Sequence, residues 1–173
     1  ELTRTSLICF QFITTNGAAA AKLLQNYGVP DKKISISTRL SDGVAPMPCD
    51  EHALSLVTQS LAGQPVWLAA YVQASEIDAV IKAHRNAIRF SHRLLLVVIF
   101  SDIQVAIAQS PDDLGLWYRA APLTFMASSL SPGSTGRGPF EAAALGSAIL
   151  YGPYVDDHLP AYSRLAAAGA ART

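Results

Sequence analysis

Residues 128–153 hold the groups whose types and order could do chemistry. The segment reads SSLSPGSTGRGPFEAAALGSAILYGP, a loop of glycines and serines followed by a proline-led, alanine-rich stretch that is typical of a helix start. Gly138 lets the backbone approach a ligand closely, and Pro139 suits the first helical position because it has no amide hydrogen to leave unpaired. The free amides at such a helix start favour an anion.

Two charged side chains in this segment fit a ligand that carries phosphate and hydroxyl groups. Arg137 can reach a phosphate, and Glu141, in the first turn of the expected helix, can accept hydrogen bonds from hydroxyls such as those of a ribose. A single glycine-rich loop is a weak signal, and the same residues also fit an ordinary loop before an ordinary helix. Both interpretations stay open at the level of this segment.

Alternating strands and helices must position this loop. Apolar runs of strand length precede stretches of helical spacing within residues 6–28, 65–90 and 94–121, and the run at 122–128 leads into the loop itself. Strands that are apolar on both faces form parallel sheets covered by helices, so the expected fold is an open α/β sandwich. Ligands of such sheets lie beyond the carboxyl ends of the strands, which is where residues 129–138 would be.

Local signals fix several other boundaries. Residues 39–50 contain a glycine and two prolines and are expected to form a linker, after which Asp50 caps a helix that ends at Gly63. Ser75 with Asp78 three residues later resembles a capping box. A short strand is expected at residues 105–108.

Composition excludes several classes of protein. Half of the 173 residues are hydrophobic, and 13 basic residues balance 13 acidic ones, so the chain is globular and has no electrostatic footprint for nucleic acid. Its longest apolar run, residues 94–100, is too short to cross a bilayer. Cys9 and Cys49 lie far apart and are expected to be unpaired thiols, and the four histidines lack ligand spacing, so no metal site is predicted.

Three segments resemble the C-terminal half of the 3-deoxy-D-manno-octulosonic acid (Kdo) transferases, the glycosyltransferases that move Kdo from CMP-Kdo onto a lipid A precursor. They are QPVWLAAYVQASEIDAVIKAHR, DDLGLWYRAAPLTFMASSL and GPFEAAALGSAILYGPYVDDHLPAYSRLAAAGAAR, which start at Gln64, Asp112 and Gly138. The resemblance implies a GT-B glycosyltransferase, in which two Rossmann-like domains face each other. Residues 33–173 would be the Rossmann-like C-terminal domain, a three-layer sandwich truncated before its closing helices. Residues 1–32 would be the last strand and helix of the N-terminal domain, outside the sheet of the larger part.

The resemblance also implies a site. The residues expected to bind the CMP-sugar donor are Glu76, Ser101, Gly136, Arg137, Gly138 and Glu141. Gly136, Pro139 and Glu141 match the Gly-Gly-His-Asn-Pro-Leu-Glu segment of the family, whereas Ser101 and Asp102 stand where the family has a basic pair.

Two functions follow as alternatives. The first is the donor-nucleotide half of a Kdo transferase-like enzyme of lipopolysaccharide biosynthesis in Gram-negative bacteria, at the cytoplasmic side of the inner membrane and without a cofactor. Its catalytic base and its lipid A precursor site would lie in the N-terminal domain, so the fragment alone is expected to be inactive. The alternative is a catalytically degenerate GT-B module that binds or regulates.

Overall fold

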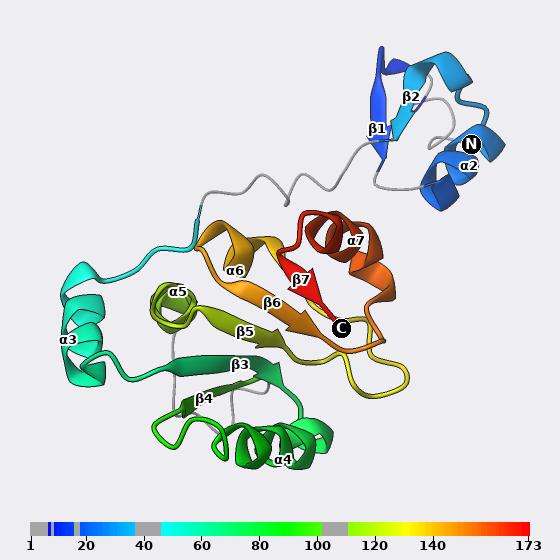
Figure 1. The fold of residues 1–173 in the computed structure, drawn as a ribbon. Coiled ribbons are helices and arrows are strands. Elements are labelled where there is room, and N and C mark those ends of the chain that lie inside the picture. Colours follow the sequence, from blue (N-terminus) through cyan, green and yellow to red (C-terminus); the bar gives the residue numbers. More distant parts are fainter. Residues whose placement is uncertain (1–6, 8, 16–17, 37–45, 102–110) are drawn as a thin grey trace. The chain divides into compact units, whose positions relative to one another are not determined.

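The computed structural model describes residues 7, 9–15, 18–36, 46–101 and 111–173, and it divides into two compact units, Glu1–Ala45 and Pro46–Thr173 (Figure 1). The sequence placed this boundary earlier, between residues 32 and 33. That residues 1–32 are the end of an N-terminal GT-B domain stays a prediction. Of the expected linker, residues 39–45 lie outside the described residues.

The smaller unit is a single strand–helix–strand motif. Strands β1 (Ile13–Thr15) and β2 (Ile34–Ile36) pair in parallel, with Ile13 opposite Ile34, and helix α2 (Ala18–Asn26) connects them. The two strands form a sheet of their own, which confirms that residues 6–28 do not complete the sheet of the larger unit. The strand expected from residue 6 is wrong at its start, because Leu7 and Cys9 are helical. Periodicity alone cannot separate the two states in a short apolar run.

The larger unit contains one five-stranded parallel sheet in the order β4-β3-β5-β6-β7. Its strands are β3 (Val66–Val72), β4 (Leu95–Phe100), β5 (Leu123–Met126), β6 (Ala148–Tyr151) and β7 (Ala171–Arg172). Its helices are α3 (Glu51–Leu61), α4 (Ile77–Ala87), α5 (Pro111–Ala120), α6 (Phe140–Ala144) and α7 (Leu159–Ala167). The predicted α/β fold with a mostly parallel sheet is therefore confirmed. The short strand expected at residues 105–108 lies outside the described residues.

Helices cover both faces of this sheet, which gives the three-layer sandwich expected. Alternate side chains of β3 point to opposite faces: Leu68 packs with Tyr118 of α5 and Tyr162 of α7, whereas Trp67 packs with Val80 of α4. Figure 1 shows α4 on one side of the sheet and α5, α6 and α7 on the other. Since every strand of this sheet runs in the same direction, the loops that follow β3, β5 and β6 gather at one edge.

Gly152 holds the loop after β6 against the loop after β5. Its amide donates a hydrogen bond to Ser129 Oγ at 2.8 Å. A Cβ atom at position 152 would collide with the Ser129 carbonyl group, 2.7 Å from its carbon, and would lie 2.8 Å from Leu130 Cδ2. Only glycine fits between these two loops.

We expect Gly152→Ala to lower the free energy of unfolding by about 1–3 kcal/mol, as overpacking of a rigid site does. Chemical denaturation of both variants and the parent protein measures this loss. Gly138→Ala is the matched control, because its Cβ would lie 3.7 Å from the nearest atoms, in the His158 ring. Equal losses in the two variants would contradict the close contact at position 152.

Candidate functional site

A buried glutamate ties together the loops at the carboxyl ends of β3 and β5. Glu76 is 1% exposed. Its Oε2 accepts hydrogen bonds from the amides of Gln73 at 3.1 Å and Ser128 at 2.7 Å, and its Oε1 accepts from the amides of Ser129 at 2.9 Å and Leu130 at 2.8 Å. These four amide dipoles replace the water that the carboxylate loses on burial. Glu76, predicted to bind the nucleotide, thus has both oxygens engaged by the backbone and positions the loop instead.

Glu76 also forms the capping box of this turn, together with Gln73. The capping box expected from Ser75 and Asp78 is therefore wrong. The Ser75 hydroxyl instead lies 3.0 Å from Ser131 Oγ, a second link between the same two loops. The actual cap starts two residues earlier because the helical turn begins with the 3-10 segment Ala74–Glu76.

Two residues at this edge have left-handed backbones that non-glycine residues rarely adopt. Tyr71 has φ 60° and Ser128 has φ 56°. A hydrogen bond links the two residues, because Ser128 Oγ donates to the Tyr71 carbonyl at 2.8 Å. The Ser128 carbonyl also accepts a hydrogen bond from the Gly136 amide at 3.1 Å. Tyr71 also lies where the pairing of β3 with β4 shifts register, between Ala69 and Val72. Strained backbone of this kind clusters at ligand sites.

The two glycines of the candidate loop differ in environment. Gly136 is buried with φ 77°, and a Cβ there would approach Val155 Cγ1 to 2.9 Å, so this glycine is required by packing inside the protein. Gly138 is exposed and has room for a Cβ. A ligand can therefore approach the backbone closely at Gly138, as predicted for this loop, but not at Gly136.

The expected anion site at the start of α6 has little support from the helix itself. Helix α6 has five residues, and its N-cap residue Pro139 makes no side-chain cap. A helix of one turn aligns few peptide dipoles, so the dipole contribution is small. Positive charge at this edge instead comes from Arg137, which is exposed and whose guanidinium carbon lies 5.1 Å from the centroid of the Tyr71 ring.

Three buried or half-buried tyrosines interact with Arg137 or Glu141. Burial raises the pKa of Tyr71, and Glu141 raises it further, while the neighbouring Tyr118 hydroxyl and Arg137 partly oppose the shift. Burial raises the pKa of Tyr118 well above its usual value, as do Tyr71 and Glu141, and burial also raises the pKa of Tyr162. All three phenols therefore stay neutral and can donate hydrogen bonds. The Tyr162 hydroxyl donates to the Arg137 carbonyl at 2.8 Å and fixes the backbone of that residue.

Only some of the residues predicted to bind the nucleotide lie close together in the structure. Arg137 and the half-buried Glu141 act on the same Tyr71 side chain, and Gly138 lies between them in the chain. Ser101 follows β4, and its amide donates to the Val72 carbonyl at 3.1 Å, so it lies at the same edge of the sheet; Asp102 is outside the described residues. Sequence reasoning missed Tyr71, Tyr118 and Tyr162 because tyrosines within apolar runs are usual core residues.

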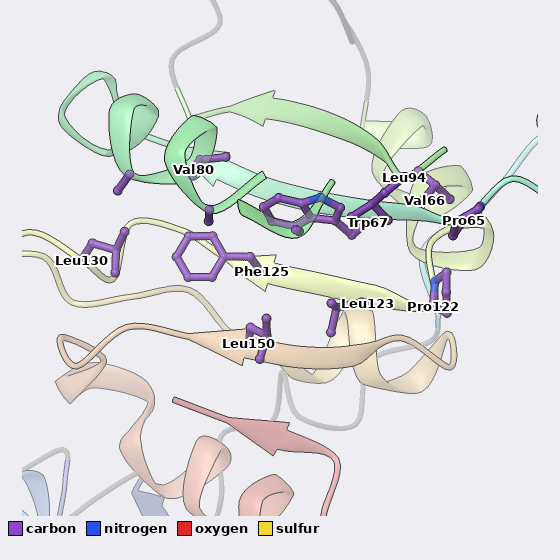
Figure 2. Close-up of a pocket in the computed structure, with 13 residues that line it drawn as sticks. Pro65, Val66, Trp67, Val80, Leu94, Pro122, Leu123, Phe125, Leu130 and Leu150 are labelled. Carbon is purple, nitrogen blue, oxygen red and sulfur yellow. The ribbon is translucent and has the colours of Figure 1, made fainter. Parts of the chain in front are cut away.

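A hollow lies on the face of the sheet that α4 covers, between α4 and strands β5 and β6. This hollow of about 490 Å³ is lined by apolar side chains, among them Trp67, Val80, Leu123, Phe125 and Leu150 (Figure 2). The one polar group that Trp67 offers, its Nε1–H, already donates to His84 Nδ1 at 3.2 Å. A phosphate or a sugar finds no partner here, so the polar edge around Tyr71 is the better candidate.

Neither a metal-binding cluster nor a membrane-spanning helix is found in the part of the chain that the structure describes. Among the residues that the structure describes, no group of three or more His, Cys, Asp or Glu side chains could hold a metal ion. In the same part of the chain, no helix is both long enough and apolar enough to cross a membrane.

The comparisons with known proteins bear on the fold. The crystal structure of the C-terminal CMP-Kdo binding domain of WaaA from Acinetobacter baumannii matches with a TM-score of 0.60 and 16% sequence identity, over 69% of this chain and 79% of that chain. The fold is the Rossmann-like fold of a GT-B C-terminal domain. This match confirms the fold that the resemblance to Kdo transferases implied. No protein-family model and no curated protein matches the chain.

We expect Glu76→Gln to lower the free energy of unfolding by about 1–3 kcal/mol or more, because the amide NH₂ that replaces one oxygen cannot accept hydrogen bonds and leaves buried amides unpaired. Urea denaturation measures the loss. Glu51→Gln, an exposed position in the first turn of α3, is the matched control and should stay within about 0.5 kcal/mol of the parent. A Glu76 variant as stable as this control would show that the carboxylate does not hold the loops.

Proposed function

We propose that the larger unit binds a CMP-sugar and is the donor-nucleotide half of a Kdo transferase-like glycosyltransferase. The observation that carries this proposal is that Arg137 lies on the Tyr71 ring while Glu141 is near enough to raise the pKa of the same tyrosine, at the carboxyl edge of a GT-B fold that resembles a CMP-Kdo binding domain. Ligands of parallel sheets bind at this edge. The fold alone leaves the chemistry open, and these side chains make the edge suitable for a nucleotide.

Each group has a distinct task in this proposal. Glu141 accepts hydrogen bonds from the ribose hydroxyls, and Arg137 leaves the Tyr71 ring to contact the phosphate. The exposed backbone at Gly138 allows close approach of the ligand. As the sugar departs, the guanidinium stabilises the negative charge that develops on the CMP phosphate.

Transfer needs groups outside this chain. A general base must lie within hydrogen-bond reach of the acceptor hydroxyl, and in this proposal that base and the lipid A precursor site belong to the N-terminal GT-B domain. The donor sugar in this proposal is Kdo or a related sugar, and the reaction takes place at the cytoplasmic side of the inner membrane. The chain alone is then expected to transfer no sugar.

A second candidate is a GT-B module that binds or regulates without transfer. It is favoured by Ser101, which places a neutral side chain beside the end of β3, where the resemblance implies a basic one. Assay of the complete protein with CMP-Kdo and lipid A precursor separates the two candidates, because only the enzyme forms product.

We expect Glu141→Ala to weaken binding of CMP by about tenfold or more, since a hydrogen bond to a charged group contributes about 1.5–3 kcal/mol. Ser101→Arg should tighten binding, because it returns a cation to the phosphate side. Calorimetric titration of CMP into the parent and both variants measures these changes.

The melting temperature provides the control for this experiment. Glu141→Ala should leave it unchanged, because Glu141 accepts no hydrogen bond within the described residues. If the parent binds no CMP and Glu141→Ala unfolds the domain, Glu141 is a structural residue and nucleotide binding is refuted.

A further inference from the structure

Tyr118 carries the one buried side-chain polar atom that lacks a hydrogen-bond partner among the described residues. The side chain extends from α5 and is 1% exposed. Comparable buried hydroxyls are paired: Tyr162 donates to the Arg137 carbonyl, and Thr124 Oγ1 lies 2.7 Å from Ser147 Oγ. An unpaired buried hydroxyl destabilises a protein, so its presence calls for an explanation.

The surroundings of this hydroxyl belong to the candidate site. Tyr118 is packed in the same buried cluster as Ala142, the neighbour of Glu141, and Tyr71 packs against that cluster. Tyr71 and Glu141 are both close enough to raise the pKa of Tyr118 beyond the effect of burial. The Tyr71 hydroxyl lies close enough to the Tyr118 hydroxyl to interact with it and raise its pKa, but the two do not reach the geometry of a full hydrogen bond. A neutral donor with no acceptor in full hydrogen-bond geometry among the described residues therefore lies near the carboxylate proposed to bind ribose.

We propose that Tyr118 is a positioning residue for Glu141 and that together they select a ligand with two adjacent hydroxyls, such as a ribonucleotide. When the ligand covers Glu141 and removes its water, one carboxylate oxygen turns inward and accepts from the Tyr118 hydroxyl. The other oxygen then faces the diol of the ligand. This inference rests on the proposed function, because it assigns the ligand class of the same site.

The argument for this role is the loss of water on binding. A carboxylate that is half-buried in the free protein still has solvent at its oxygens, and a bound sugar displaces that solvent. A charged acceptor without water binds the nearest available donor, and a charge-assisted hydrogen bond is about twice as strong as a neutral one. Tyr118 thus gains its missing partner only in the complex, where the bond contributes to affinity.

The first measurement uses the full chain without ligand. Tyr118→Phe removes an unpaired hydroxyl and should raise the melting temperature by about 2–4 °C. Tyr162→Phe is the matched control, since it removes the same atom from an equally buried tyrosine whose hydroxyl is paired with the Arg137 carbonyl, and it should lower the melting temperature. If Tyr118→Phe does not raise the melting temperature, the hydroxyl is already paired and the inference is overturned.

The second measurement compares CMP with 2′-deoxy-CMP by calorimetric titration. The parent should bind CMP about tenfold more tightly, and Tyr118→Phe should reduce this ratio towards one by weakening CMP alone. Tyr162→Phe disturbs the backbone of Arg137 and should weaken both ligands equally, which leaves the ratio unchanged.

The outcomes separate this inference from the proposed function. A parent that binds CMP, with the same preference in the Tyr118→Phe variant, overturns the role of Tyr118 and leaves nucleotide binding intact. A parent that binds neither ligand refutes the proposed function, and the role of Tyr118 falls with it. A more stable Tyr118→Phe variant that has lost the preference supports the inference.

Discussion

The carboxyl edge of the sheet depends on the buried carboxylate of Glu76. A negative charge without solvent is tolerated only when hydrogen bonds replace its water, and here four backbone amides do so. Three of those amides belong to residues 128–130, in the loop after β5. The loop after β6 is then attached in turn, because Ser129 accepts from the amides of Gly152 and Tyr154. The loops after β3, β5 and β6 thus share one set of hydrogen bonds.

This set of hydrogen bonds explains how the strained residues persist. A left-handed backbone at Tyr71 and at Ser128 costs about 1–3 kcal/mol each. Hydrogen bonds to a charged group contribute about 1.5–3 kcal/mol each, and Glu76 makes four of them. The carboxylate therefore outweighs the strain. The backbone of Tyr71 and of the loop after β5 is therefore set before any ligand arrives, which lowers the entropy lost on binding.

The sequence predicts the strands and helices well where apolar runs are long and bounded by glycine or proline, as for β3 and β5. The sequence predicts the role of a side chain poorly where that role depends on contacts with residues far away in the chain. Glu76 is a plausible ligand contact in the sequence, but its role is decided by amides more than fifty residues away. Tyr118 has the pattern of an ordinary core residue, and only the structure shows that its hydroxyl lacks a hydrogen-bond partner among the residues described. The length of α6 is also invisible in an alanine-rich run that ends at a glycine.

The short α6 changes where phosphate affinity can come from. With few aligned dipoles, a phosphate at this edge depends on the Arg137 guanidinium, which lies on the Tyr71 ring. A cation–π contact at an exposed position is worth about 0.5–1 kcal/mol, less than the roughly 1.5–3 kcal/mol of a charge-assisted hydrogen bond. Arg137 can therefore leave Tyr71 for a phosphate with a modest net gain. In the proposed site, the nucleotide contacts the two side chains of Arg137 and Glu141, and the return of the arginine to the Tyr71 ring offsets part of the cost of releasing it.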